Sequence, residues 1–347
     1  MRVLVTGGTG FVGSHTVAAI ARAGHDVRLF VRSPERIAPA LDPLAVGPVG
    51  HVVGDVTDEG AVAKAIEGCD AVVHAAAVFT LDRNRDAEVE ATNLAGARNV
   101  LEAAHRADVD PILFVSSLSA LFPPDAAVFT PDTAVKNPIN PYARSKAAAE
   151  RVARELQADG APIVITYPGS VWGPYDPHRG EAGRIVTRFV KLGIAPCPPA
   201  GGMPVVDARD LGALHAAALE RGRGPRRYLA GGHLLNTDAL FALFSEVTGR
   251  RFLSVPTPAG LLRGFGHVVD FFQRAFGIDL LLTHEAMETL TRMVPCDETL
   301  SRKELGFVPR PPGETLRDTL LWMFNEGLIT PRQVGRLAEH PGRPATT

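Results

Sequence analysis

Residues 3–13 read VLVTGGTGFVG, and this stretch decides how the rest of the chain is interpreted. It opens on an apolar run typical of a buried strand, and the alanine-rich stretch Gly13–Ala23 has the composition of a helix. Between them, Gly8, Gly10 and Gly13 fit the spacing Gly-x-Gly-x-x-Gly. In a strand–turn–helix context this spacing predicts a dinucleotide-binding loop, because bare backbone and the free N–H groups of a helix N-terminus can approach a pyrophosphate.

The first half of the chain repeats this alternation of short apolar runs and helical stretches. Further strands are predicted at 26–31, 51–53, 71–74, 112–115, 163–166 and 228–230, and helices at 56–68, 93–107, 142–157 and 210–220. Strands that alternate with helices build a parallel sheet covered on both faces. The sequence therefore predicts an α/β fold, a Rossmann-type doubly wound parallel sheet with a smaller, mostly helical C-terminal substrate lobe.

The alternation ends at about residue 166, where prolines and glycines become frequent. We expect residues 1–166 to form the dinucleotide-binding domain, with 205–235 returning to it. The substrate-binding lobe is then expected from 167–204 and 236–340, and 341–347 are expected to be a disordered tail.

Composition argues against several function classes. The 347 residues are 46% hydrophobic, and a net charge of −2 with interspersed signs indicates no nucleic-acid partner and no anionic membrane partner. No uncharged apolar run reaches the roughly 18 residues of a membrane span, and the N-terminus lacks a signal-peptide pattern. Cys69, Cys197 and Cys296 have no metal-ligand spacing. We expect a cytoplasmic protein with no stable membrane insertion and no metal.

The end of the second predicted strand bears on which dinucleotide binds. NAD-binding folds usually place Asp or Glu there to hold the ribose 2′-OH. Here the strand ends at Arg32, and Arg36 follows. A guanidinium can make paired, charge-assisted bonds to a 2′-phosphate. We therefore expect NADP(H) rather than NAD(H), with Arg32 as the main determinant and Arg36 as an assistant; the alternative is that both are solvated surface residues.

Other candidate cofactor contacts follow from positions at strand ends. Asp55 could accept a hydrogen bond from the adenine amino group, and it fits a turn aspartate equally well. The small side chains of Ala75, Ala76 and Ala77 would let the cofactor lie flat against the sheet edge. The dinucleotide-binding residues expected in this part of the chain are Gly7, Gly8, Thr9, Gly10, Phe11, Val12, Gly13, Asp55, Val56, Ala75, Ala76 and Ala77.

The most informative short segment is the hexapeptide at 141–146, PYARSK. Asn140 can cap a helix whose first position is Pro141, so Tyr142 and Lys146 stand four apart on one face. A phenol has an ordinary pKa of about 10 and is a poor acid–base group at neutral pH. A neighbouring ammonium lowers that pKa, so Tyr142 could exchange a proton with a carbonyl or alcohol oxygen. Lys146 could also hydrogen-bond the nicotinamide ribose.

Two polar residues could complete this constellation. Ser117 follows the predicted strand at 112–115, at the sheet edge where ligands bind in open α/β folds, and it could polarise a substrate oxygen. Asn93 is expected to open the helix at 93–107 and could hold a proton-relay water. Taken singly, each of these residues also has an ordinary structural explanation.

Taken as a set, these motifs resemble the extended short-chain dehydrogenase/reductase superfamily, also called the NAD-dependent epimerase/dehydratase family. The order and spacing match over roughly residues 1–175, and Val206–Asp210 (VDARD) resembles a later family segment. Within the superfamily, Phe30–Pro34 (FVRSP) resembles the dihydroflavonol reductase and 3β-hydroxysteroid dehydrogenase side. Nucleotide-sugar epimerases more often carry the acidic strand end that is missing here.

The resemblance implies roles for individual residues. Tyr142 is then the proton donor, Lys146 its activator, Ser117 the carbonyl-orienting hydroxyl and Asn93 the relay residue. The segment Pro168, Gly169, Ser170 and Val171 resembles the one that touches the nicotinamide. The helices at 93–107 and 142–157 often form a dimer interface in such families, so a homodimer is possible.

Three functions fit these residues. The first is an NADP(H)-dependent oxidoreductase that transfers a hydride between the nicotinamide and a carbonyl or alcohol of a largely apolar small molecule. The second is a nucleotide-sugar epimerase or dehydratase with bound NAD(P), in which Arg184, Arg188 and Lys191 could grip a diphosphate. The third is a non-catalytic dinucleotide-binding redox sensor, although such proteins usually lose the tyrosine or the lysine.

A stretch of the C-terminal lobe has apolar residues at helical spacing. They are Leu261, Leu262, Phe265, Val268, Val269, Phe272 and Phe276. The favoured interpretation is a helix face packed on the core. The alternatives are an apolar lid over a hydrophobic substrate and a patch that touches a membrane surface.

Overall fold

The computed structural model describes residues 1–78, 86–138, 140–276, 284–339, 342 and 344–346. A seven-stranded sheet with the order β10-β6-β5-β4-β1-β2-β3 forms its main layer, and every strand pair in it is parallel. The strands are β1 (Arg2–Thr6), β2 (Asp26–Val31), β3 (Gly50–Val53), β4 (Ala71–His74), β5 (Ile112–Val115), β6 (Ile163–Pro168) and β10 (Arg226–Ala230).

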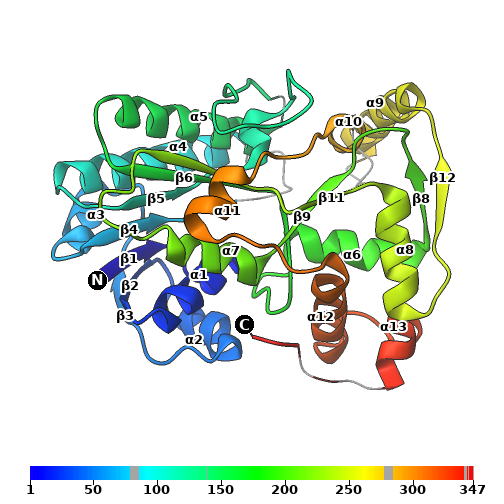
Figure 1. Ribbon diagram of the computed structural model, residues 1–347, viewed down its shortest axis with the longest axis horizontal. Coiled ribbons are helices and arrows are strands. Elements are labelled where there is room, and N and C mark those ends of the chain that lie inside the picture. The colour runs from blue at the N-terminus through cyan, green and yellow to red at the C-terminus, as the bar shows by residue number, and fades with distance from the viewer. Residues whose placement is uncertain (79–85, 139, 277–283, 340–341, 343, 347) are drawn as a thin grey trace.

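Helices cover both faces of this sheet (Figure 1). One face carries α3 (Glu59–Ile66), α4 (Asp86–Arg106) and α5 (Pro141–Ala158), and the other carries α1 (Phe11–Arg22), α2 (Ile37–Leu41) and α7 (Ala208–Ala217). Alternate strand residues therefore enter two separate cores: on β5, Phe114 packs on the first face and Leu113 on the second. The predicted doubly wound α/β fold is confirmed.

The strand order reverses between β1 and β4. The chain passes from β1 outward to β2 and β3, and then returns to the other side of β1 at β4. In open α/β sheets ligands bind outside the carboxyl ends of the strands at such a reversal. The fold thus places any dinucleotide site at the ends of β1 and β4.

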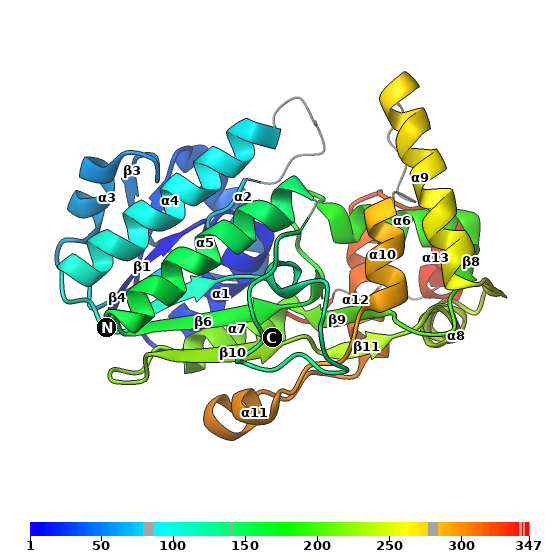
Figure 2. The ribbon, with the colours of Figure 1, turned by 90° about the horizontal axis from the view of Figure 1, so that it is seen from above.

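A second lobe contains two small sheets and most of the remaining helices (Figure 2). The strands β7 (Ser170–Trp172), β9 (Met203–Asp207) and β11 (His233–Leu235) form one sheet, and β8 (Ile194–Cys197) and β12 (Leu253–Pro256) form the other. The helices of this lobe are α6 (Glu181–Leu192), α8 (Thr237–Thr248), α9 (Ala259–Phe276), α10 (His284–Arg292), α12 (Pro312–Asn325) and α13 (Pro331–Val334). The helix α11 (Thr299–Leu305) packs instead on β10 of the main sheet and on α7. Within 205–235, α7 and β10 pack on the main sheet, whereas β9 and β11 pair in the second lobe.

Beyond residue 166, β6 continues to Pro168 and β7 follows. Two expectations from the sequence need correction. The helix expected to open at Asn93 begins at Asp86, so Asn93 lies inside α4. In the tail expected to be disordered, the carbonyls of Pro344 and Ala345 accept hydrogen bonds from Tyr175 and Arg209.

The apolar stripe of α9 is divided between two environments. Leu262 and Val269 are buried, as expected for a core-facing stripe, but Leu261, Phe265 and Val268 are exposed. The side chains of Phe272 and Phe276 lie outside the described residues. Over the described part of the chain, no helix combines the length and the apolar character that crossing a bilayer requires.

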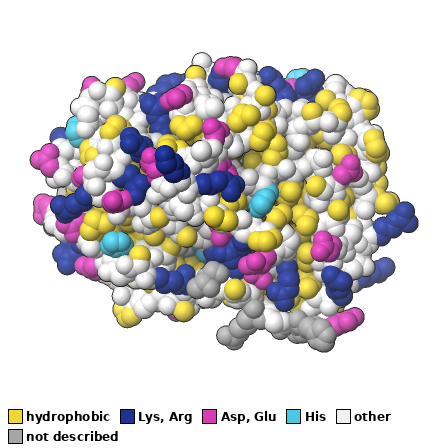
Figure 3. Space-filling view, viewed as in Figure 1, with side chains coloured by type: hydrophobic (Ala, Val, Ile, Leu, Met, Phe, Trp, Pro, Cys, Tyr) yellow, Lys and Arg dark blue, Asp and Glu magenta, His cyan; other side chains and the backbone are white. Residues whose placement is uncertain are grey.

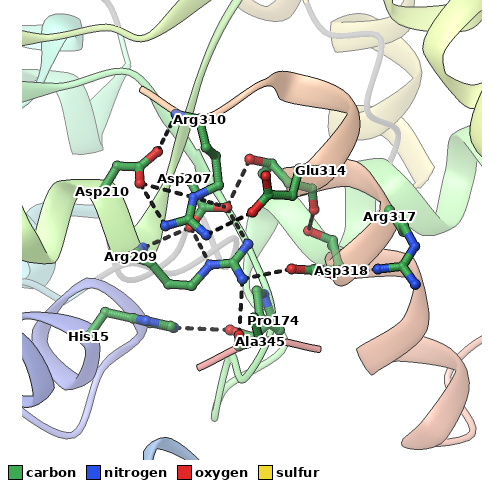
Figure 4. Close-up of polar contacts among 12 residues, drawn as sticks. His15, Pro174, Asp207, Arg209, Asp210, Arg310, Glu314, Arg317, Asp318 and Ala345 are labelled. Carbon is green, nitrogen blue, oxygen red and sulfur yellow. Dashed lines mark hydrogen bonds and ion pairs between the residues drawn. The ribbon is translucent and has the colours of Figure 1, made fainter. Parts of the chain in front are cut away.

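A buried ion-pair network ties the second lobe to the main sheet (Figure 4). Arg209, at the start of α7, donates to both carboxylate oxygens of Asp207 (2.9 and 2.8 Å) and to Asp318 of α12 (2.7 Å). Arg310 makes two side-chain bonds to Asp210 (2.9 and 2.7 Å). The VDARD segment therefore joins the two parts of the molecule. Arg209 links the start of α7 to α12, and Asp210 links α7 to Arg310 in the loop that precedes α12.

The network keeps the Asp207 carboxylate in its charged form. Burial alone would raise the pKa of Asp207, but hydrogen bonds and charge from Arg209, with the charge of Arg310, hold that pKa below its ordinary value. The Arg209 side chain is 2% exposed and that of Asp207 is fully buried. A buried pair of this kind is costly to break, because removing one partner leaves an uncompensated charge.

Replacing Arg209 by Ala should destabilise the protein by about 3–5 kcal/mol, because Asp207 and Asp318 lose their shared counter-charge. The measurement is urea unfolding followed by circular dichroism. Arg221→Ala is the matched control: it breaks an exposed pair with Asp70 and should cost at most about 1 kcal/mol. Equal losses in the two variants would contradict the role assigned to the buried network.

Candidate active site

Two glycines at the loop between β1 and α1, Gly7 and Gly13, leave no room for a side chain. Gly7 has φ +74°, and a Cβ built there would stand 2.6 Å from the backbone nitrogen of Ala76. A Cβ at Gly13 would stand 2.0 Å from the carbonyl oxygen of Gly7. The N-cap position of α1 is Gly10, which supplies no capping side chain, and the first turn contains no acidic residue. The loop therefore fits a pyrophosphate held by backbone N–H groups at a helix N-terminus.

The ends of β1 and β4 are locked together beside this loop. The Thr6 hydroxyl bonds Nδ1 of His74 (2.8 Å), and the backbone N–H of Ala75 donates to the Thr6 carbonyl (3.2 Å). Burial, with the charge of Lys146 as a second cause, lowers the pKa of His74 to about 3, so the imidazole is neutral. The tripeptide Ala75–Ala77 thus leaves the sheet edge in a fixed direction, directly against Gly7.

Arg32 and Asp55 lie close to each other beyond the ends of β2 and β3. Their side chains are 63% and 40% exposed, and Nη1 of Arg32 stands 3.7 Å from Oδ2 of Asp55. Asp55 also accepts bonds from the backbone N–H and hydroxyl of Thr57 (2.9 and 2.8 Å), which hold its pKa below the ordinary value. The turn interpretation of Asp55 is therefore the one its contacts support. The exposed guanidinium of Arg32 can still turn towards another anion.

The first turns of α5 carry Tyr142 and Lys146. Asn140 caps this helix by accepting from the backbone N–H of Ala143 (3.0 Å), as the sequence predicts. The Lys146 side chain reaches the end of β5, where its Nζ donates to the carbonyl of Val115 (3.0 Å). The same Nζ lies 6.0 Å from the centre of the Tyr142 ring. Lys146 is only 7% exposed, and burial lowers its pKa to about 8. The predicted phenol–ammonium pair is therefore brought together at the sheet edge.

Sequence reasoning missed Glu150, one turn beyond Lys146 on the same helix. Its fully buried carboxylate accepts bonds from the Tyr167 hydroxyl and from Nε of Arg154 (2.8 Å). Its other oxygen, Oε2, has no hydrogen-bond partner among the described residues. The carboxylate opposes the effect of burial on the pKa of Lys146 and so favours the ammonium form. The spacing i+4 from Lys146 is the signal that could have found it.

The two serines after β5 are in different environments. Ser117 Oγ accepts bonds from the backbone N–H (3.2 Å) and hydroxyl (3.0 Å) of Ser119. A hydroxyl has one proton and two acceptor sites, so the proton of Ser117 stays available for a substrate oxygen. Ser116 is 3% exposed, and its Oγ has no hydrogen-bond partner in the described part of the chain. The sequence could not distinguish these adjacent residues.

Asn93 joins two parts of the site. Its carboxamide exchanges two hydrogen bonds with the backbone of Val78 (2.7 and 2.9 Å) and donates to Ser145 Oγ (3.0 Å). Asn93 therefore links the segment after β4 to α5, and its contact on α5 is Ser145, the residue before Lys146. Counting only the hydrogen bonds made by the described residues, Oδ1 of Asn93 accepts one bond and could accept another from a water molecule.

The remaining expected residues lie at two edges of the site. Pro168 ends β6, Ser170 and Val171 begin β7, and the backbone N–H of Gly169 donates to Ala230 (3.1 Å). Arg36 ends a short 3₁₀ turn after β2 and is exposed. Within the described ranges, no group of three or more His, Cys, Asp or Glu side chains is placed to hold a metal ion. On the face seen in Figure 3, acidic and basic side chains are interspersed.

Comparison with known proteins shows which family the chain resembles. Residues 3–231 match the NAD dependent epimerase/dehydratase family. The chain belongs to this family. The family relationship expected from the motifs is therefore confirmed, and the protein is an enzyme of the epimerase/dehydratase superfamily.

Relatives within the epimerase/dehydratase superfamily cover nearly the whole chain. The "Putative dihydroflavonol 4-reductase" of Synechocystis sp. is 28% identical over 333 residues, with 94% of this chain and 95% of that protein covered. The sterol demethylase protein B of Methylococcus capsulatus is also 28% identical, with 95% and 100% covered. The dTDP-glucose 4,6-dehydratase DesIV of Streptomyces venezuelae, solved as a double mutant with NAD bound, is 25% identical with a TM-score of 0.71, covering 96% of this chain and 100% of that one.

Replacing Glu150 by Gln should lower the pKa of Lys146 further below about 8, because the carboxylate that favours the ammonium is removed. Lysine labelled with ¹³C at Cε reports this as a pH titration of its NMR shift, with Lys146→Met assigning the resonance. Glu155→Gln, on the exposed side of the same helix, should leave the titration unchanged. An unchanged or raised pKa in Glu150→Gln would contradict the electrostatic role of Glu150.

Proposed function

We propose that this protein is an NADP(H)-dependent oxidoreductase that transfers a hydride between the nicotinamide and a carbonyl or alcohol of a largely apolar small molecule. The observation that carries the proposal is the placement of Tyr142 beside the buried ammonium of Lys146. Both lie at the carboxyl edge of the sheet that also carries the glycine loop. This is the arrangement that proton transfer to a carbonyl oxygen requires.

The side chains have separable tasks in this reaction. The glycine loop and Arg32 would hold NADPH, which would supply a hydride to the carbonyl carbon. The Ser117 hydroxyl donates to the carbonyl oxygen and orients it, and Tyr142 gives its proton to the same oxygen. The Lys146 ammonium stabilises the phenolate that remains, and in the reverse direction the phenolate removes the alcohol proton. A water on Asn93 would return a proton to the site.

The preference for NADP(H) rests on Arg32. Its ion pair with Asp55 joins two exposed side chains at 3.7 Å, and such pairs contribute little to stability. Arg32 can therefore turn towards a 2′-phosphate at small cost and bind it through two N–H groups. Arg36, next to it on the exposed turn after β2, would add a second positive charge.

The apolar substrate is supported by two full-length relatives, one named as a dihydroflavonol reductase and the other as sterol demethylase protein B. We infer that 167–204 and 236–340 bind this substrate, since they supply the part of the molecule beyond the carboxyl edge of the sheet. The competing function is sugar-nucleotide epimerisation or dehydration, as in DesIV. Arg184 and Arg188, half-buried one turn apart on α6, could grip a diphosphate in that case.

Replacing Tyr142 by Phe should lower turnover at least about 100-fold, because the proton donor is lost, and should leave NADPH affinity nearly unchanged. Turnover is measured as NADPH oxidation with a panel of aromatic, steroid and aliphatic carbonyls. Tyr228→Phe, a tyrosine on the edge strand β10, is the control and should remain active.

Retained turnover in Tyr142→Phe would remove the proposed mechanism. A wild-type protein that is inactive on every carbonyl but is thermally stabilised by UDP, with NAD copurifying, would favour the epimerase or dehydratase. Stoichiometric NADPH binding with neither property would favour a redox sensor.

Replacing Arg32 by Ala should raise the Kd for NADPH about 10–100-fold, which is the loss expected for a charge-assisted pair of hydrogen bonds. The Kd for NADH should change little, because NADH lacks the 2′-phosphate. Both values come from isothermal titration calorimetry, with Arg36→Ala expected to give a smaller effect. Parallel losses for NADPH and NADH would show that Arg32 does not determine the choice of dinucleotide.

A further inference from the structure

One end of the molecule carries most of the exposed large hydrophobic side chains. In the described part of the chain ten such side chains are exposed, and seven of them belong to the end of α6, to the two-stranded sheet and to α9. Figure 1 places β8, β12 and α9 together at the end of the molecule opposite the main sheet, and Figure 2 places β8 and α9 at that same end. A concentration of this kind marks an interaction surface, whereas single exposed hydrophobic residues do not.

The two-stranded sheet supplies the first part of this surface. Leu253 and Val255 lie two residues apart on β12 and so share a face, and Leu253 pairs with Ile194 of β8. All three are 44–48% exposed. Leu192, 58% exposed, ends α6 directly before β8. On the face seen in Figure 3, hydrophobic side chains are frequent at this end of the molecule.

The second part is an uncovered face of α9. Leu261, Phe265 and Val268 recur with helical spacing and are 49–65% exposed, while the opposite face of the helix packs on α10. A Cβ built at Gly264, next to Phe265, would meet no atom within 4 Å. In Figure 2, α9 projects from the body of the protein. We name these seven residues on α6, β8, β12 and α9 the lobe-end surface.

Basic residues outnumber acidic ones in the elements that carry the lobe-end surface. Residues 181–197 and 250–276 supply all seven hydrophobic side chains, and they contain six arginines, one lysine, one Asp and one Glu. The whole chain has a net charge of −2, so this local excess is hidden in the overall composition. Lys191 and Arg251, the immediate neighbours of the sheet part, are both exposed.

Two carboxylates reach this region from neighbouring elements, and both are engaged. Asp238 accepts a hydrogen bond from Ser254 of β12. Glu288 of α10 pairs with Arg263 (3.5 Å) and Arg292 (3.1 Å). Neither carboxylate is paired with Lys191 or Arg251 in the contacts of the described residues.

We propose that the lobe-end surface docks reversibly on an anionic membrane surface. The apolar side chains of β8, β12 and α9 enter the boundary between headgroups and acyl chains, and Lys191 and Arg251 face anionic headgroups. Apolar area and attraction to anionic lipid act together in such docking. A second copy of the chain is the poorer occupant, because a two-fold symmetric contact would bring the same basic residues face to face.

The test is co-sedimentation of the full chain with vesicles of phosphatidylcholine alone or mixed with phosphatidylglycerol. The wild-type protein should bind the anionic vesicles and release them as salt is added. The double variant Leu261→Ser with Phe265→Ser should lower binding at least about tenfold, since the apolar contact is lost. Lys191→Glu with Arg251→Glu should abolish the preference for anionic lipid.

The matched control is Val53→Ser with Val308→Ser, which removes two exposed hydrophobic side chains far from α9 in the sequence and should not alter binding. Thermal unfolding checks that each variant is folded. Failure of the wild-type protein to bind anionic vesicles, or equal losses in the α9 variant and the control, would overturn the proposal. It would also be overturned if light scattering without vesicles showed a dimer that Leu261→Ser with Phe265→Ser converts to a monomer.

Discussion

The Lys146 ammonium is held almost out of solvent at the end of β5, and the rest of the site is arranged around it. Its hydrogen bond to the Val115 carbonyl attaches α5 to the sheet edge, and this attachment also fixes where Tyr142 stands. Burial lowers the pKa of the ammonium, while the carboxylate of Glu150 opposes this shift. A charge that is buried yet supported in this way acts strongly on a neighbouring phenol, because little water screens it.

The cofactor side of the site depends on a steric constraint. Gly7 and Gly13 approach other backbone so closely that neither can carry a side chain, and this closeness brings the N-terminus of α1 to the ends of β1 and β4. The bond between Thr6 and His74 and the bridge made by Asn93 then fix the segment after β4. The glycine loop and the pair Tyr142 and Lys146 therefore lie at one edge of the sheet, joined by these hydrogen bonds.

The sequence predicts the main sheet well, because buried parallel strands such as β4 and β5 are short, fully apolar runs with clear ends. The placement of Tyr142 near Lys146 was also predictable, since their spacing on a helix is a local property. The small strands β7, β8, β11 and β12 were missed because each has only three or four residues and depends on pairing with distant segments. Part of the apolar stripe of α9 was expected to be buried but is exposed. Helical spacing shows which residues share a face of a helix, but it does not show whether another element covers that face.

We propose that a nicotinamide ring lies against the Tyr142 hydroxyl when the pyrophosphate occupies the glycine loop. The most direct measurement is a crystal structure of the protein with NADP⁺. We predict that phosphate oxygens lie within hydrogen-bond distance of the first backbone N–H groups of α1. We also predict that C4 of the nicotinamide faces the Tyr142 hydroxyl. A dinucleotide bound away from the glycine loop, or a Tyr142 hydroxyl turned away from the nicotinamide, would contradict this placement.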